Sequence, residues 1–209
     1  MPPVIIAAIP YGDDRDLGRA HNEFMEMLPE DGWGCLLDHD VMFTTREWHR
    51  QLSAAVAEKP EGTFTCVTNR VKCPFQNVPG ISMKTHDMWY HREIGFNRLR
   101  DFGGQLRDVT GSSRTPAGLM MMMSKKAWRE AGKFPSGLHY MDRTMWTALR
   151  MTGRHIYIIE GLYLYHWHRG GGDDAEPFQK GEWVKRHNLP DGRIITWQEP
   201  KEGFPEYTG

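Results

Sequence analysis

The sequence predicts an α/β fold, a mostly parallel central sheet flanked by helices, in one domain that covers residues 1–209. Two observations support this prediction. Three short apolar runs, at 4–9, 33–37 and 63–68, are typical of buried strands. Between these runs apolar residues recur at helical spacing, and strands that alternate with helices indicate βαβ units. A chain of 209 residues can form one substantial core, and no linker divides it.

The first half of the chain reads as strand, helix, strand, helix, strand. The run at 4–9 suits a central strand covered on both faces. A helix is predicted from Asp16 to Pro29, with the apolar stripe Leu17, Ala20, Phe24 and Leu28. After the strand at 33–37, Thr44 and Glu47 have the spacing of a capping box. They predict a second helix, with the stripe Trp48, Leu52 and Val56, before the strand at 63–68.

The second half predicts further helices and strands around a surface stretch, 69–115, that is rich in Arg, His, Trp and Gly. The expected elements are a helix near 85–100, a strand at 118–123, a helix from Ser124 to Ala131, a helix near 139–152, and strands at 155–159 and 162–166. Ser124 is the expected N-cap of its helix, and Gly132 and Gly153 are expected to end helices. The four methionines at 120–123 are interpreted as core residues. The tail beyond 170 is expected to be irregular.

Composition excludes several classes of protein. Charged residues nearly balance, with 26 basic and 27 acidic side chains, so no overall field indicates a nucleic-acid or membrane partner. Cys35, Cys66 and Cys73 lack zinc-site spacing and are interpreted as reduced core thiols. The first apolar run is too short for a signal peptide. No stretch approaches the roughly 20 apolar residues of a membrane span. We therefore expect a cytoplasmic protein without membrane attachment.

Asp38-His39-Asp40 is the motif that carries most chemical information. It directly follows the apolar run at 33–37, and ligands of open α/β sheets bind at the carboxyl ends of strands. On an extended segment both carboxylates point to one side, while His39 points to the other and is expected to be a packing residue. Two carboxylates can hold a divalent cation and leave positions for phosphate oxygens. The alternative is an ordinary pair of turn carboxylates.

The order of motifs resembles nucleotide-sugar glycosyltransferases of the GT-A fold, in a compact, family-2-like form. The resemblance covers about residues 4–169. It rests on three blocks: Ala8-Ile9-Pro10-Tyr11 with Arg15 and the following helix, Leu36-Leu37-Asp38-His39-Asp40, and a longer series made of 118–128, Gly132-Lys133-Phe134, Tyr140-Met141-Asp142-Arg143, Gly153 and His166-Trp167-His168. Two departures stand out. Only about 30 residues separate the first strand from Asp38, so the nucleotide-binding half is abbreviated, and the family's acidic pair is reduced to Met141-Asp142.

The resemblance implies a single GT-A (Rossmann-like) domain, in which 1–68 is the donor and metal half, 69–170 the acceptor half and 171–209 the tail. It also implies transfer of a sugar from a nucleoside-diphosphate sugar, UDP-sugar favoured, to an acceptor hydroxyl. The implied cofactor is Mn²⁺ (or Mg²⁺), and an imidazole ligand favours manganese. The residues implied are Asp38, Asp40 and either His166 or His168 for the metal, Pro10, Tyr11, Arg15, Asp38 and Arg169 for the donor, and Asp142 as general base.

The acceptor is open at this stage. The stretch Trp89-Tyr90-His91-Arg92, with Arg98 and Arg100, combines aromatic rings and cations, which is the chemistry that binds unpaired bases. A hydroxymethylated base in DNA is therefore one candidate acceptor. A sugar or a peptide in the same groove is another.

Other classes of function compete with the transferase. A haloacid-dehalogenase-like phosphatase would use Asp38 as nucleophile and Asp40 as acid and base, but in this chain a full strand and helix precede the motif. A sugar nucleotidyltransferase needs a basic, Gly-rich loop after the first strand, where this chain has the acidic Gly12-Asp13-Asp14. A non-catalytic nucleotide- or sugar-binding module is the third alternative.

Overall fold

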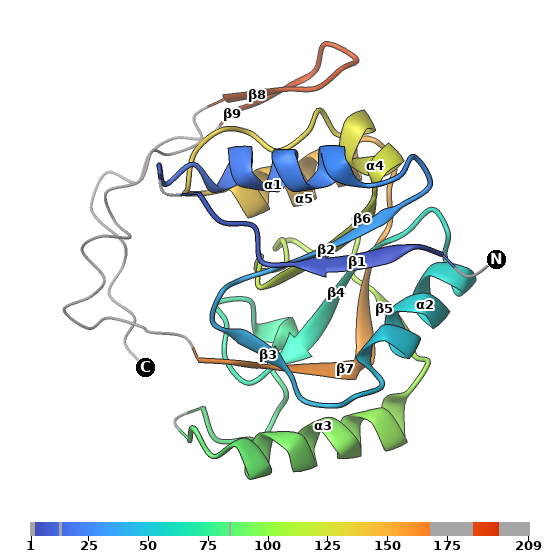
Figure 1. Cartoon of the computed structure of the whole chain (residues 1–209), viewed down its shortest axis with the longest axis vertical. Coiled ribbons are helices and arrows are strands. Elements are labelled where there is room, and N and C mark those ends of the chain that lie inside the picture. Colours follow the sequence, from blue (N-terminus) through green and yellow to red (C-terminus); the bar gives the residue numbers. More distant parts are fainter. Residues whose placement is uncertain (1–2, 13, 84, 168–185, 197–209) are drawn as a thin grey trace.

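The computed structural model describes residues 3–12, 14–83, 85–167 and 186–196. Its centre is a seven-stranded sheet with the order β1-β2-β6-β4-β7-β3, in which β5 also pairs with β7 (Figure 1). The strands are β1 (Ile5–Ala8), β2 (Trp33–Leu37), β3 (Val41–Phe43), β4 (Thr63–Thr68), β5 (Leu106–Asp108), β6 (Met120–Ser124) and β7 (Ile156–His166). The expected α/β class is confirmed, but the sheet is mixed. Pairs β1–β2 and β4–β7 are parallel, and the other pairs are antiparallel.

Helices cover both faces of the sheet. They are α1 (Leu17–Met27), α2 (Trp48–Glu58), α3 (Met88–Phe102), α4 (Lys125–Glu130) and α5 (Met141–Met151), with a short 3-10 turn, η1 (Pro74–Gln76). Side chains of α1, α4 and α5 share one hydrophobic cluster, and side chains of α2 lie in a second cluster on the opposite face. Figure 1 shows α1, α4 and α5 together on one side of the sheet, while α3 lies below β7.

The methionine run forms the centre of the core, as expected. Because side chains alternate along β6, Met121 and Met123 belong to the cluster under α1, α4 and α5, and Met120 and Met122 belong to the cluster under α2. All four are fully buried. The unbranched thioether side chain adapts to both faces of this strand, so the run is structural.

Several expected boundaries are confirmed. Ser124 caps α4, because its hydroxyl accepts a hydrogen bond from the Ala127 N–H at 3.1 Å. Gly132 and Gly153 follow α4 and α5 with positive φ angles of 83° and 81°, a conformation that other residues rarely adopt. The three cysteines are buried free thiols, and burial raises the pKa of Cys35 to about 12.

Two predictions in the first half are wrong. β1 is an edge strand and not a central one: it pairs with β2 alone among the described strands, and Ile6 is 42% exposed. A continuous apolar run does not reveal how many neighbours a strand has. The capping box is also wrong. The Thr44 hydroxyl donates to the Tyr163 carbonyl at 2.7 Å, and α2 begins later, without a side-chain cap.

The two strands expected at 155–159 and 162–166 are one strand, β7. Its pairing with β4 shifts register, because Cys66 lies opposite Ile159 and Val67 lies opposite Tyr163. The extra residues form a bulge that includes Gly161. A Cβ atom there would lie 2.8 Å from Gln51 Oε1 and 2.9 Å from the Cα of Gly103, so only glycine fits without displacement.

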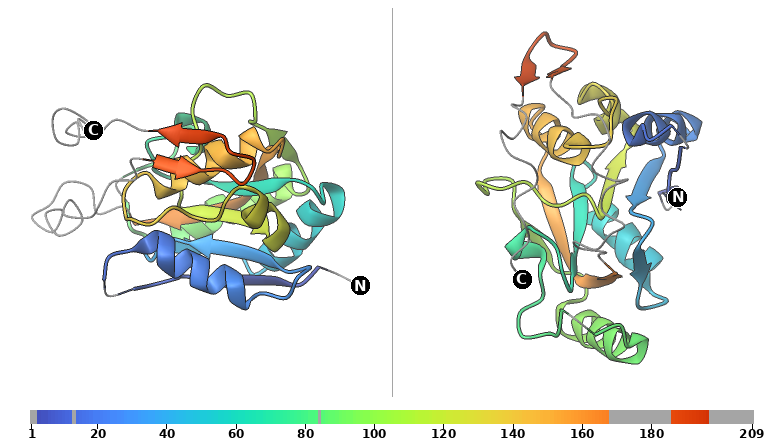
Figure 2. Two further views of the ribbon diagram at one scale, coloured as in Figure 1. Left: turned by 90° about the horizontal axis from the view of Figure 1, so that it is seen from above. Right: turned by 90° about the vertical axis from the view of Figure 1, so that its left-hand side faces the viewer.

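The tail contains regular structure that the sequence did not predict. Two short strands, β8 (Arg186–Asn188) and β9 (Ile194–Thr196), form an antiparallel hairpin, which lies beside α5 in Figure 2. Leu189 and Ile195 anchor it in the same cluster as α4 and α5, and His187 Nε2 lies 2.9 Å from the Ala131 carbonyl. The prediction of an irregular tail is therefore wrong for 186–196. The rest of the tail lies outside the described residues.

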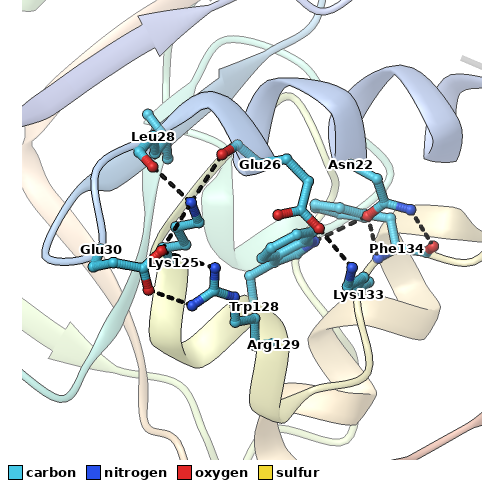
Figure 3. A network of polar contacts seen from close by, with 9 residues as sticks. All are labelled: Asn22, Glu26, Leu28, Glu30, Lys125, Trp128, Arg129, Lys133 and Phe134. Atoms are coloured by element: carbon cyan, nitrogen blue, oxygen red, sulfur yellow. Dashed lines mark hydrogen bonds and ion pairs between the residues drawn. The ribbon is translucent and has the colours of Figure 1, made fainter.

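A polar network fastens α1 to α4 and to the turn after it (Figure 3). The Asn22 Oδ1 atom accepts hydrogen bonds from Trp128 Nε1 at 2.9 Å and from the Phe134 N–H at 2.8 Å, and Asn22 Nδ2 donates to the Phe134 carbonyl at 2.8 Å. Lys125 is also buried, and its ammonium donates to the carbonyls of Glu26 and Leu28 at 2.8 and 2.7 Å. These bonds satisfy polar groups that would otherwise be costly to bury.

We predict that Asn22→Ala lowers the free energy of unfolding by about 2–3 kcal/mol, because it leaves partly buried groups of Trp128 and Phe134 without partners. Urea denaturation followed by circular dichroism would measure the change. Asn97→Ala, an exposed change of the same kind on α3, is the control and should stay within about 0.5 kcal/mol of the wild type. Equal stability of the two variants would contradict the role of this network.

Candidate functional site

The candidate site lies where several strands end at one edge of the sheet. Because β2, β4 and β7 run in the same direction and β6 runs against them, the carboxyl ends of the first three and the amino end of β6 meet there. A cavity of about 850 Å³ opens at this edge. Its lining includes Asp38, His39, Asp40, Lys72, Arg114, Tyr140, Asp142, Arg143 and His166. Ligand sites of α/β sheets commonly occupy this position.

Asp38 and Asp40 lie in the turn that connects β2 to β3, and not on an extended segment. The Asp38 N–H donates to the Leu119 carbonyl at 3.1 Å, and the Asp40 carbonyl accepts from the Trp167 N–H at 2.9 Å. These bonds fix the turn against the residue before β6 and the residue after β7. The expected convergence of the two carboxylates is found, although the geometry that produces it differs from strand alternation.

His166 completes a group of three potential ligands. It is the last residue of β7, and β3 pairs with it so that Val41 lies opposite His166. One ligand atom from each of Asp38, Asp40 and His166 lies within 4.8 Å of the others, and His166 Nε2 is 3.4 Å from Asp40 Oδ1. Two carboxylate oxygens and one imidazole nitrogen are suitable ligands for a divalent transition metal.

The orientation of the His166 ring is set by the segment after β4. Its Nδ1 atom lies 2.8 Å from the Arg70 carbonyl, which can only accept, so Nδ1 carries a proton. The Asn69 amide bonds both the N–H and the carbonyl of His166, at 2.8 and 3.1 Å. Nε2 is thereby directed toward Asp40. Such support from a neighbouring carbonyl is typical of histidines that bind metals.

The three groups have shifted protonation equilibria. Burial raises the pKa of Asp38 to about 6, and the charges of Asp40 and Asp142 add to this while His166 opposes it. Burial would also raise the pKa of Asp40, but the hydrogen bond and charge of His166 outweigh it and lower that pKa. Burial would lower the pKa of His166, yet the bond to Asp40 and its charge raise it. Attraction between His166 and Asp40 therefore competes with the repulsion that Asp40 and Asp142 exert on Asp38.

Asp142 faces the same cavity from the first turn of α5. A Cβ atom at position 118 would lie 2.6 Å from the Asp142 Cβ, so the glycine there allows the carboxylate to approach β6. Burial raises the pKa of Asp142, although backbone N–H groups of Arg143 and Gly118 oppose the shift. The preceding Tyr140 has a φ angle of 63°, a conformation that costs free energy in a non-glycine residue.

The other predicted site residues lie elsewhere or cannot be placed. Pro10, Tyr11 and Arg15 are not part of the cavity lining, and Tyr11 is 84% exposed. They follow β1, whose carboxyl end lies beside that of β2, so they share the edge of the sheet with Asp38. His168 and Arg169 lie outside the described residues. His39 is exposed at the cavity and is not a packing residue, because it sits in a turn.

The sequence did not assign a binding role to four cations that also line the cavity, Lys72, Arg114, Arg143 and Arg150. The first two belong to the stretch 69–115, which the sequence marks only as a surface stretch rich in Arg, His, Trp and Gly. The Arg150 guanidinium donates to the carbonyls of Thr110 and Ser112 at 3.2 and 2.8 Å and so positions the segment before β6. The cavity is therefore lined by both acidic and basic side chains.

Comparison with known proteins adds no identification. No protein-family model matches the chain, and no curated protein matches it. Within the described part of the chain, no helix is both long and apolar enough to cross a membrane. The function has to be argued from the residues that meet at the cavity.

Proposed function

We propose that this chain is a metal-dependent glycosyltransferase, which moves a sugar from a nucleoside-diphosphate sugar to an acceptor hydroxyl. The observation that carries the proposal is the meeting of Asp38, Asp40 and His166 in one cavity with the carboxylate of Asp142. Three metal ligands supply a place for a diphosphate, and a fourth, separate carboxylate supplies a base. A binding module would need the first of these features only.

The metal ligands fit a divalent cation that also binds phosphate oxygens. When bound, such a cation supplies Lewis-acid stabilisation of the negative charge that develops on the departing nucleoside diphosphate. Asp38, Asp40 and His166 would hold it, and the imidazole favours Mn²⁺ over Mg²⁺. The carboxyl end of β1 lies beside that of β2, which Asp38 follows, and the residues after β1, Pro10, Tyr11 and Arg15, are the proposed contacts of the donor nucleotide.

Asp142 is the proposed general base. A base must take a proton from the acceptor hydroxyl near neutral pH, and a carboxylate with a raised pKa does this better than a solvated one. Its backbone hydrogen bond from the Arg143 N–H, at 2.7 Å, holds one oxygen, Oδ1.

The phosphatase alternative makes different demands on Asp38. A nucleophilic aspartate needs an open approach for the phosphorus atom, whereas Asp38 is partly buried and shares its surroundings with Asp40 and His166. A nucleophilic aspartate must also be ionised, and the raised pKa of Asp38 disfavours its ionised form. These properties favour a ligand of a metal over an attacking group.

We predict that the wild-type protein binds Mn²⁺ and that Asp40→Asn weakens this binding by roughly tenfold to a hundredfold, because it removes one charged ligand. Electron paramagnetic resonance of free Mn²⁺ would measure it. Asp31→Asn, an exposed carboxylate before β2, is the matched control and should bind like the wild type. Incubation with a panel of nucleoside-diphosphate sugars and Mn²⁺ should then release the nucleoside diphosphate with the wild type and the control, and much less with Asp40→Asn. Release of nucleoside diphosphate by the wild type without metal would contradict the proposal. Release by Asp40→Asn at the wild-type rate would also contradict it.

Asp38 generates a prediction about stability and pH. Its folded-state pKa of about 6 lies above the ordinary 3.8, so the folded protein binds more protons here than the unfolded chain between pH 4 and 6. In the metal-free protein this group's contribution to stability is therefore present near pH 4 and is lost as the pH rises through 6. Asp38→Asn should raise the free energy of unfolding at pH 7.5 by on the order of 1–3 kcal/mol, with little change at pH 4.

Urea denaturation in metal-free buffer at the two pH values would measure this difference. Added Mn²⁺ should stabilise the wild type and leave Asp38→Asn unchanged, because only the first has its full set of ligands. If Asp38→Asn is less stable than the wild type at pH 7.5 without metal, ionised Asp38 does not lower the free energy of unfolding and the prediction is wrong.

For Asp142 we predict a loss of catalysis without a loss of metal. Asp142→Asn should bind Mn²⁺ like the wild type but lower the release of nucleoside diphosphate by roughly 10²–10⁴-fold, the usual contribution of a general base. Parallel titration with Mn²⁺ and measurement of donor turnover would separate the two effects. Turnover within a few-fold of the wild type would remove Asp142 from the mechanism.

A further inference from the structure

The cations that line the cavity have no task in the chemistry described so far. The proposed metal and donor diphosphate use Asp38, Asp40 and His166. Lys72 and Arg114 line the same cavity, and Arg143 joins them from α5. Several cations in one cavity attract a ligand with more than one negative charge.

The topology of the sheet brings Lys72 and Arg114 together. Lys72 follows the carboxyl end of β4, and Arg114 precedes the amino end of β6. These strands pair in antiparallel orientation, with Phe64 opposite Met122, so both segments emerge at the same edge. Burial raises the pKa of the Cys73 thiol to about 11, and the positive charge of Arg114 is one of the influences that oppose the shift. The guanidinium therefore lies near the segment that carries Lys72.

The segment that carries Arg114 is held in place before any ligand binds. Arg150 binds the carbonyls of Thr110 and Ser112, and the Ala117 N–H donates to the buried Gln76 side chain at 2.7 Å. The backbone N–H of Arg114 lies 3.3 Å from the Ser112 hydroxyl. Its guanidinium, by contrast, has no hydrogen-bond or ion-pair partner among the residues that the structure describes. An arginine whose backbone is held in place and whose guanidinium has no protein partner is well suited to bind an anion.

We infer that Arg114 and Lys72 bind a phosphate group of the acceptor. The acceptor's part in this inference rests on the glycosyl transfer proposed above, while the phosphate site itself does not. A phosphate carries up to two charges and three oxygens, and it can engage cations from different segments at once, whereas a carboxylate matches a single arginine. Asp38, Asp40 and His166 would bind the donor, and Arg114 and Lys72 would bind the acceptor, with Asp142 lining the same cavity.

The test measures binding of inorganic phosphate to the metal-free protein by isothermal titration calorimetry. The wild type should bind, and Arg114→Gln should bind about tenfold more weakly, as loss of one charge-assisted contact implies. Arg50→Gln, an exposed change on α2 outside the cavity, is the matched control and should bind like the wild type. No binding by the wild type, or equal binding by Arg114→Gln, would overturn the inference.

Two further arms separate this inference from the proposed function. Asp40→Asn should keep phosphate binding while it loses Mn²⁺, and Arg114→Gln should keep Mn²⁺, so each site can fail alone. Glycerol 3-phosphate and a short single-stranded oligonucleotide with hydroxymethylcytosine should then be tested as competitors of phosphate. Displacement by the first indicates a small phosphorylated acceptor, and displacement by the second alone indicates a nucleic-acid backbone. If neither displaces phosphate, the site does not serve an acceptor and the inference is wrong.

Discussion

The pairing of β3 with the end of β7 is the constraint on which the candidate site depends. Val41 lies opposite His166, and the Asp40 carbonyl continues this ladder by accepting from the Trp167 N–H. Asp40 and His166 are 126 positions apart in the sequence, yet this register makes them neighbours. A shift of one residue would turn the His166 side chain to the other face of the sheet and dismantle the group of ligands. The bulge at Gly161 therefore matters, because it sets the register of β7 beyond that point.

The same arrangement makes the site costly to fold. Asp38, Asp40 and Asp142 share one partly buried cavity, and the raised pKa of Asp38 reports that its charge is unfavourable there. His166 offsets part of the cost through its interaction with Asp40. The remainder is what a bound cation would relieve. Acidic groups held in such a state are typical of sites in which function has been favoured over stability.

Local signals were sufficient for much of the fold. The strand at 63–68 and the Ser124 cap depend on residues close in the sequence, and both are found as expected. The position of β1 at the edge, the role of Thr44 and the three-residue strand β3 depend on distant partners, and no local pattern encodes them. The Asp38-His39-Asp40 motif was recognised through strand alternation, but a turn and a distant strand bring its carboxylates together. The convergence of the two carboxylates was thus predicted from a geometry that the protein does not use.

The basic residues were missed for a related physical reason. The sheet fixes the positions of Asp38, Asp40 and His166, because each of them follows or ends a strand. Sequence motifs at strand ends can therefore be recognised. Lys72 and Arg114 lie on connecting segments, and hydrogen bonds from Arg150 and to Gln76 hold the segment that carries Arg114. An arginine in such a segment has the same appearance in a sequence as a solvated one. The rigid sheet edge supplies the groups proposed for the reaction, while side-chain contacts to loop backbone supply the groups proposed for selecting the acceptor. Changes in the loops can then alter the proposed acceptor site without disturbing the proposed metal ligands, which is the division expected when binding residues are carried on loops of a rigid scaffold.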